Sequence, residues 1–196
     1  FANYWMHNGF VNIDNVKMSK SLGNFITVHD ALKTIDGQVL RFFFATQHYR
    51  KPINFTEKAV RDAETNLKYL KNTYEQPFTG EVDPADLQGF VDKFIVAMDE
   101  DINAANGITV VFELAKWINS GHYDQDVKDA LTKMLEVFGV VFVEEVLDAD
   151  IEALIAERQE ARAKKDFARA DAIRDELAAQ GIKLLDTKEG VRWTRD

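Results

Sequence analysis

Residues 17–24 read Lys17-Met18-Ser19-Lys20-Ser21-Leu22-Gly23-Asn24. Two lysines and two serines fall within five residues, and a glycine follows shortly after. Ammonium and hydroxyl groups donate hydrogen bonds to anions, and glycine lets backbone amides approach them closely. A helix expected near Thr27 would add the positive end of its dipole. The segment therefore predicts a phosphate-binding loop, without the spacing of the Walker type. A solvated polar loop is the alternative.

Outward from this loop the sequence predicts a mostly helical chain. Thr27 is placed to cap a short helix over 28–34, and Thr56 to cap a longer helix to about residue 74. A very apolar helix is expected between them, over 38–47. The first 25 residues carry short apolar stretches instead, and they suggest the edge of an α/β domain.

A proline- and glycine-containing stretch at 77–85 predicts a linker before the next helices. Apolar residues then recur at helical spacing and predict one side that faces a core. These residues are Leu87, Phe90, Val91, Phe94, Ile95, Met98 and Ile102. Helices are also expected over 109–119, 126–138, 151–165 and 167–180, followed by a β-hairpin over 182–194.

Composition narrows the class of protein. The 196 residues are 46% hydrophobic, which suffices for a core and argues against intrinsic disorder. The chain has no cysteine, which excludes disulfides and cysteine-ligated metal sites within it. No apolar run approaches the roughly 18 residues of a membrane span. Phe1 is neither an initiator methionine nor the start of a signal peptide, so we expect a chain that begins partway through a larger protein.

The net charge of −9 is an average over unlike parts. Residues 1–80 carry +3, residues 81–150 carry −12, and residues 151–196 are neutral. A uniformly anionic protein would repel nucleic acid, but here both ends are free to meet phosphates.

The neutral end contains a row of basic residues. Arg158, Arg162, Lys165 and Arg169 are spaced by four, three and four, which is one face of a continuous helix. A solvated face with salt bridges is the alternative. Phe167 interrupts the row, and an aromatic beside arginines suits stacking on an unpaired base. Near the end of the chain, Trp193 is either a lid on a small core, which we favour, or a further stacking surface.

The string at 17–21, KMSKS in one-letter code, is the signature of class I aminoacyl-tRNA synthetases. Together with other stretches that match in order along nearly the whole chain, it resembles the cysteinyl-tRNA synthetase family. The stretches with the most matches are Tyr4-Trp5-Met6-His7, Val39-Leu40-Arg41-Phe42-Phe43, His48-Tyr49-Arg50-Lys51-Pro52-Ile53-Asn54-Phe55, Met98-Asp99-Glu100-Asp101-Ile102-Asn103, Lys165-Asp166-Phe167-Ala168-Arg169-Ala170-Asp171 and Gly190-Val191-Arg192-Trp193.

The resemblance implies that cysteine and ATP form cysteinyl adenylate and pyrophosphate, and that the cysteinyl group passes to tRNA(Cys). It makes Lys20 the ATP-contacting lysine, with Lys17 assisting, so both are candidate catalytic residues. Met18, Ser19 and Ser21 complete the ATP-binding loop. The loop is expected to close over ATP, with Gly9, Gly23 and the turn at 14–15 as hinge points. The residues that match anticodon contacts are Arg162, Phe167, Asp171 and Asp186.

The resemblance also implies a division of the chain. Residues 1–27 would be the end of the catalytic domain, 28–76 helices that contact the tRNA stem, 77–85 a linker, 86–147 a helical bundle, and 148–196 an anticodon-binding domain of helices and a hairpin. The expected fold is therefore mainly α, with the remnant edge of an α/β class I catalytic domain. A cytoplasmic monomer that does not bind membranes is expected.

The other half of the family's active site is missing from the sequence. In the family, zinc and the cysteine substrate are bound by residues that precede the KMSKS loop, and these have no counterpart here. His7 alone is not a metal site, so no metal ligand is predicted. The chain by itself is expected to be inactive. Two alternatives stay open, namely the related ligase that joins cysteine to glucosaminyl-inositol and a non-catalytic tRNA-binding module.

Overall fold

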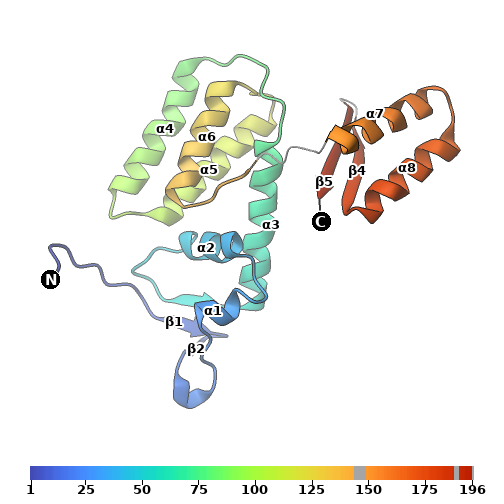
Figure 1. Cartoon of the computed structure of the whole chain (residues 1–196). Coiled ribbons are helices and arrows are strands. Elements are labelled where there is room, and N and C mark those ends of the chain that lie inside the picture. The colour runs from blue at the N-terminus through green and yellow to red at the C-terminus, as the bar shows by residue number, and fades with distance from the viewer. Residues whose placement is uncertain (144–148, 188–189, 196) are drawn as a thin grey trace. The chain divides into compact units, whose positions relative to one another are not determined.

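The computed structural model describes residues 1–143, 149–187 and 190–195. Eight α-helices and five short strands form in this part of the chain, which confirms the mainly helical class. The chain divides into two units, one over Phe1–Phe142 and one over Val143–Asp196 (Figure 1).

The first unit begins with a three-stranded sheet of order β2-β1-β3. β1 (Val11–Ile13) pairs antiparallel with β2 (Val16–Lys17) and parallel with β3 (Ile53–Phe55). The turn between β1 and β2 consists of Asp14 and Asn15, with φ of +48° and +65°. These two residue types tolerate left-handed backbone, which suits a two-residue hairpin turn. Parallel strands need a crossover connection, and here α1 (Val28–Ala31) and α2 (Gly37–Ala45) lie between β1 and β3 in the chain. This strand–helix–strand arrangement confirms the predicted edge of an α/β domain.

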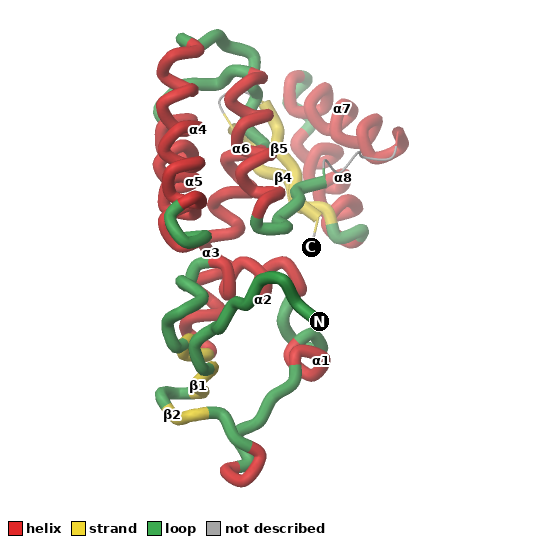
Figure 2. Tube along the Cα trace, turned by 90° about the vertical axis from the view of Figure 1, so that its left-hand side faces the viewer, coloured by secondary structure: helices red, strands yellow, loops and turns green. Residues whose placement is uncertain are grey.

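Helices build the rest of this unit around one core. They are α1 (Val28–Ala31), α2 (Gly37–Ala45), α3 (Glu57–Tyr74), α4 (Pro84–Asp99), α5 (Ala104–Asn119) and α6 (Gln125–Val137). As predicted, Thr27 caps α1 and Thr56 caps α3. Fully buried side chains from α2, α3, α5 and α6 meet in the core, among them Phe42, Leu70, Leu114 and Leu131. Figure 2 shows α4, α5 and α6 on one side of α2 and the small sheet on the other.

The predicted apolar side of α4 is only partly correct. Phe94 is buried, and Leu87, Phe90, Val91 and Met98 pack against the core. Ile95 and Ile102 are instead 49% and 51% exposed. α4 ends at Asp99, and Ile102 then has a φ of +51°, so the helical spacing no longer applies to it. Ile95 is within the helix but at the edge of the stripe, outside the contact with α5 and α6.

The stretch predicted as a linker lies against the helices. Phe78 and Val82 pack on the core, and the N–H of Gly80 donates to the carbonyl of Tyr123 over 2.5 Å. A Cβ at Gly80 would collide with that carbonyl oxygen, so glycine is required for the close approach.

The second unit is a pair of helices and a hairpin. α7 (Ala149–Ala163) and α8 (Phe167–Ala179) are followed by β4 (Ile182–Thr187) and β5 (Gly190–Arg195), which pair antiparallel. Its core is formed by Ile151, Ile173, Leu177 and Ile182. Trp193 packs against this core, which confirms its interpretation as a lid.

We predict that Thr56→Ala lowers the free energy of unfolding by about 1 kcal/mol, because the Thr56 hydroxyl accepts the Ala59 N–H over 3.0 Å at the start of α3. Urea unfolding followed by circular dichroism measures the change. Thr65→Ala is the matched control, since Thr65 is inside the same helix and bonds only the preceding turn, to the Arg61 carbonyl. An equal loss in both variants would contradict a capping role.

Candidate functional site

The loop at 17–24 extends from the outer strand of the small sheet. β2 ends at Lys17, and the N–H of Met18 donates to the Val11 carbonyl over 3.3 Å. Both views show the loop projecting beyond β2, away from α4, α5 and α6 (Figures 1 and 2). The predicted phosphate-binding residues therefore lie together at one end of the first unit.

Asn24 closes this loop with its side-chain amide. Its Oδ1 accepts the N–H of Ser19 over 2.9 Å, and its Nδ2 donates to the carbonyl of Lys17 over 3.3 Å. One side chain at the end of the loop thus holds two residues at its start, Lys17 and Ser19. Asn24 belongs to the quoted motif but is not among the predicted site residues. Its contacts with Lys17 and Ser19 form only when the loop folds back, and the spacing of these residues in the sequence does not indicate them.

The two serines shape the short turn between the lysines. Residues Lys20–Leu22 form one turn of 3-10 helix, and the Ser19 Oγ accepts the Leu22 N–H over 3.3 Å at its start. The Ser19 and Ser21 hydroxyl oxygens are 3.2 Å apart and share a hydrogen bond. Gly23 ends the turn with a φ of +69°, a backbone conformation that glycine adopts without strain.

Both lysines of the loop are exposed and lie beside aromatic rings. The Nζ of Lys17 is 4.5 Å from the centre of the Phe10 ring, and the Nζ of Lys20 is 5.5 Å from that of Phe25. No carboxylate among the described residues forms an ion pair with either ammonium. A weak cation–π contact is easily exchanged for a phosphate, so both charges are available to an anionic ligand.

The expected contribution from the dipole of the following helix is not supported. α1 has only four residues, and its first turn contains Asp30. The Lys33 ammonium, and then the Thr27 hydroxyl, hold the pKa of Asp30 below its ordinary value. A negative charge already sits at this helix end and offsets its partial positive charge, so the helix dipole adds little to anion binding by the loop.

The contacts of Gly9 do not favour the hinge expected at this position. The N–H of Gly9 donates to the Tyr49 carbonyl over 2.7 Å, and its backbone touches the Lys51 carbonyl. At the neighbouring turn, the side chains of Asn15 and Asn54 bond over 2.9 Å. Glycine at position 9 permits close contact between segments rather than rotation of one against the other.

In the second unit, Phe167 is the first residue of α8 and is 62% exposed. Asp171 lies one turn further on, and its carboxylate pairs with Arg174 over 3.2 Å. Arg162 is in the last turn of α7. Three of the predicted anticodon residues thus lie on α7 and α8, close to the turn that joins them. The side chain of Asp186 lies outside the part of the chain that the structure describes.

The predicted single face of basic residues does not form. α7 ends at Ala163 and α8 begins at Phe167, so the basic residues are not on one continuous helix. Lys165, in the turn, has a φ of +62°. Arg158 is only 7% exposed, and Arg169 pairs with Glu157 over 2.8 Å. The alternative of a partly salt-bridged surface is the better description.

Metal and membrane sites are not found in the described ranges. No group of three or more metal-ligating side chains gathers there. The described residues therefore do not fit a zinc ion. No described helix is both long and apolar enough to cross a membrane.

Three family models match successive parts of the chain. The class I (C) tRNA synthetase catalytic domain matches residues 1–65, the DALR domain matches 93–144, and the cysteinyl-tRNA ligase anticodon-binding domain matches 144–193. The loop at 17–24 thus lies in the catalytic match, and Phe167 lies in the anticodon-binding match.

Relatives match the chain from end to end. It is 84% identical over its 196 residues to the cysteine–tRNA ligase of Streptococcus pneumoniae serotype 4, and 81% identical to that of Streptococcus mutans serotype c. It spans 44% of the length of each of these relatives. A crystal structure of a ternary complex of Agrobacterium radiobacter LeuRS with tRNA and LeuAMS has a TM-score of 0.50 and 19% identity. It covers 67% of this chain and 20% of its own, and shows the fold alone.

Proposed function

Because this chain belongs to the cysteine–tRNA ligase family, matching the C-terminal 44% of its relatives, we propose that it supplies the ATP loop and the tRNA-binding part of such an enzyme. The enzyme activates cysteine with ATP and transfers it to tRNA(Cys). The observation that carries this proposal is the 84% identity over the whole chain to a curated cysteine–tRNA ligase.

In the activation step, the cysteine carboxylate attacks the α-phosphate of ATP and pyrophosphate departs. Negative charge grows on the pyrophosphate, so a positioned ammonium stabilises the transition state more than the ground state. We assign this role to Lys20, with Lys17 assisting. The absence of a carboxylate partner for either lysine among the described residues supports the assignment. The backbone around Met18 and the hydroxyls of Ser19 and Ser21 maintain the loop.

We assign tRNA recognition to the second unit. The exposure of Phe167 supports a role in stacking on an unpaired base, and Arg162, in the last turn of α7, would contact the backbone or a base of the anticodon loop. Asp171 and Asp186 would accept hydrogen bonds from base edges. Since Asp171 pairs with Arg174, the RNA has to compete for this carboxylate or contact both groups. We keep the division that the family resemblance implies. It assigns 1–27 to the end of the catalytic domain, 28–76 to tRNA stem contacts, 77–85 to a linker, 86–147 to a helical bundle and 148–196 to anticodon binding.

The match of residues 144–193 to an anticodon-binding domain favours the tRNA enzyme over the glucosaminyl-inositol ligase, which needs no anticodon reader. A cytoplasmic monomer is proposed. ATP, cysteine and tRNA(Cys) are its substrates, and zinc binding is assigned to a part of the enzyme other than this chain, which has no cysteine.

The proposal is tested in a chimera, in which this chain replaces the matching C-terminal 44% of the Streptococcus pneumoniae relative. We expect the chimera to attach cysteine to tRNA(Cys) at a rate within about tenfold of that relative, since the exchanged parts are 84% identical. Anticodon-substituted tRNA(Cys) should be charged more slowly. A soluble, folded chimera that charges no tRNA would contradict the proposal, and equal charging of both tRNAs would contradict the anticodon role.

The 196-residue chain alone should catalyse no detectable ATP–pyrophosphate exchange with cysteine. It contributes cationic groups for the leaving pyrophosphate, but the family resemblance assigns cysteine binding to residues that the chain lacks. The assay follows incorporation of labelled pyrophosphate into ATP, with the chimera as the positive control. Cysteine-dependent exchange by the purified chain would overturn this expectation.

A further inference from the structure

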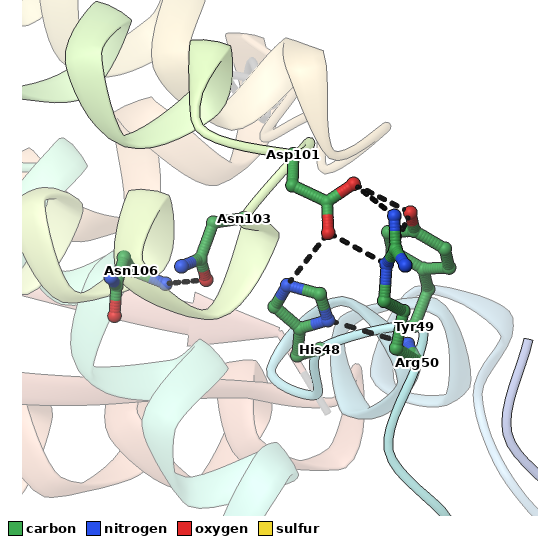
Figure 3. Close-up of polar contacts among 6 residues, drawn as sticks. All are labelled: His48, Tyr49, Arg50, Asp101, Asn103 and Asn106. Carbon is green, nitrogen blue, oxygen red and sulfur yellow. Dashed lines mark hydrogen bonds and ion pairs between the residues drawn. The ribbon is translucent and has the colours of Figure 1, made fainter.

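Three consecutive residues, His48, Tyr49 and Arg50, converge on the carboxylate of Asp101 (Figure 3). The Tyr49 hydroxyl donates to Oδ1 over 2.7 Å, and the Arg50 guanidinium contacts both oxygens, over 2.7 Å and 3.0 Å. The Nε2 of His48 is 3.9 Å from Oδ2. The Arg50 guanidinium, followed by the Tyr49 hydroxyl, holds the pKa of Asp101 below its ordinary value, so the carboxylate is charged at neutral pH.

Asp101 is presented by an unusual turn between α4 and α5. Its φ is +60°, and that of Ile102 is +51°, although a β-branched residue strongly disfavours this region. Asn103 then caps α5, accepting the Asn106 N–H over 3.1 Å. Asp101 bonds to Tyr49 and Arg50, and Asn103 holds the other end of the turn on α5. The direction of the Asp101 carboxylate is therefore well defined.

The other side of this contact leads directly to the ATP loop. The segment at 48–50 lies between α2 and β3, and the Tyr49 carbonyl accepts the N–H of Gly9 over 2.7 Å. The carbonyl of the next residue in the chain, Phe10, accepts the N–H of Ile53 over 2.8 Å. β1 then pairs with both β3 and β2, and β2 ends at Lys17, where the loop begins. Direct backbone contacts therefore connect the partners of Asp101 to the loop.

The apolar core also joins α4 and α5 to α2 and α3, but burial of apolar surface is non-directional. A bidentate ion pair with an added hydrogen bond has a defined geometry instead. The polar contact at Asp101 is therefore suited to set how the sheet and its loop are oriented on the helices.

Resting on the function proposed above, we propose that Asp101 is a positioning residue for the ATP loop: by holding His48–Arg50 it fixes the β2-β1-β3 sheet, and with it Lys17 and Lys20, against the α4–α5 turn. It touches no substrate. Its effect is on the rate of the activation step, because small displacements of a group that stabilises a transition state reduce the rate greatly.

The test uses Asp101→Asn in the chimera. Asparagine keeps the size and tolerates left-handed backbone, and it can accept from Tyr49, but it loses the charge that Arg50 requires. We expect kcat for pyrophosphate exchange to fall about tenfold, with the KM for ATP changed less than about twofold. Ile102→Gly is the matched control, since it changes the same turn, suits the positive φ and leaves the carboxylate in place. It should retain the parental kcat.

A double-mutant cycle tests whether Asp101 acts through Arg50. Arg50→Gln alone should lower kcat about tenfold, and the Asp101→Asn/Arg50→Gln double variant should fall about tenfold as well, because the two residues form one contact. An additive loss of about a hundredfold, or an unchanged kcat in Asp101→Asn, would overturn the proposal.

A second measurement does not depend on activity. In the 196-residue chain, hydrogen exchange at the amides of Gly9, Met18 and Ser19 should be about fivefold faster in Asp101→Asn than in the parent, and unchanged in Ile102→Gly. Unchanged exchange at all three amides in Asp101→Asn would overturn the positioning role. If the parental chimera proves inactive while this difference in exchange is seen, the proposed function fails and the structural link holds.

Discussion

Lys20→Ala in the chimera is expected to lower the rate of cysteine-dependent pyrophosphate exchange by about 10²–10³-fold, the loss typical of removing one preorganised donor to a developing negative charge. The Lys20 ammonium is exposed, lies on a turn closed by Asn24, and has no carboxylate partner among the described residues. The interaction strengthens as charge develops on the pyrophosphate, so kcat should fall more than the KM for ATP rises.

Lys33→Ala is the control for the removal of a nearby positive charge. Lys33 is also on the surface, but its ammonium pairs with Asp30 over 2.6 Å. We expect this variant to keep exchange within about twofold of the parent, since a surface ion pair with a single contact, unlike a bidentate arginine–carboxylate pair, contributes little. Circular dichroism checks that both variants are folded. If Lys20→Ala lowered the exchange rate by less than about threefold, the loss of any surface charge would explain the effect, and the assigned role of Lys20 would be contradicted.

Phe167→Ala should reduce kcat/KM for tRNA(Cys) by about 5- to 150-fold, which corresponds to about 1–3 kcal/mol for one stacked base. The side chain is 62% exposed at the start of α8, so its truncation removes little packing from the core around Ile173 and Leu177. Steady-state aminoacylation with varied tRNA concentration measures the effect.

Two comparisons make this result specific. Pyrophosphate exchange, which needs no tRNA, should be unchanged in Phe167→Ala, whereas a folding defect would lower both activities. Phe167→Trp should keep or raise kcat/KM, because the larger ring stacks over more area. If Phe167→Ala charged wild-type and anticodon-substituted tRNA in the same ratio as the parent, the anticodon role of Phe167 would be wrong.

Local patterns located the helices and the loop well. Thr27 and Thr56 were correctly placed as caps, because a cap depends on a side chain and backbone groups two or three residues away. The helix ends near Gly121, Gly139 and Gly181 are also local features. All three glycines have positive φ, a backbone conformation that commonly ends a helix. Errors arose where a short interruption changed the geometry, as at Lys165, which separates α7 from α8 and divides the predicted basic face.

The contact at Asp101 could not be predicted in this way. Its partners are 51 and 52 residues away in the chain, and nothing in the spacing of the two segments indicates that they meet. Asp99, Glu100 and Asp101 look alike as a run of acids. Only the end of α4 and the left-handed φ at Asp101 direct one of these carboxylates toward Arg50.

The helical class, the position of the KMSKS loop and the family of the chain follow from the amino-acid sequence alone, because they depend on local periodicity and on matching letters in order. Tertiary packing sets which charged side chains form ion pairs between segments and which stay available to a ligand. It paired Arg169 with Glu157, joined Asp101 to Arg50, and left Lys17 and Lys20 beside aromatic rings. An ion pair between separate segments depends on distances of a few ångström, and these distances are set only when the core packs.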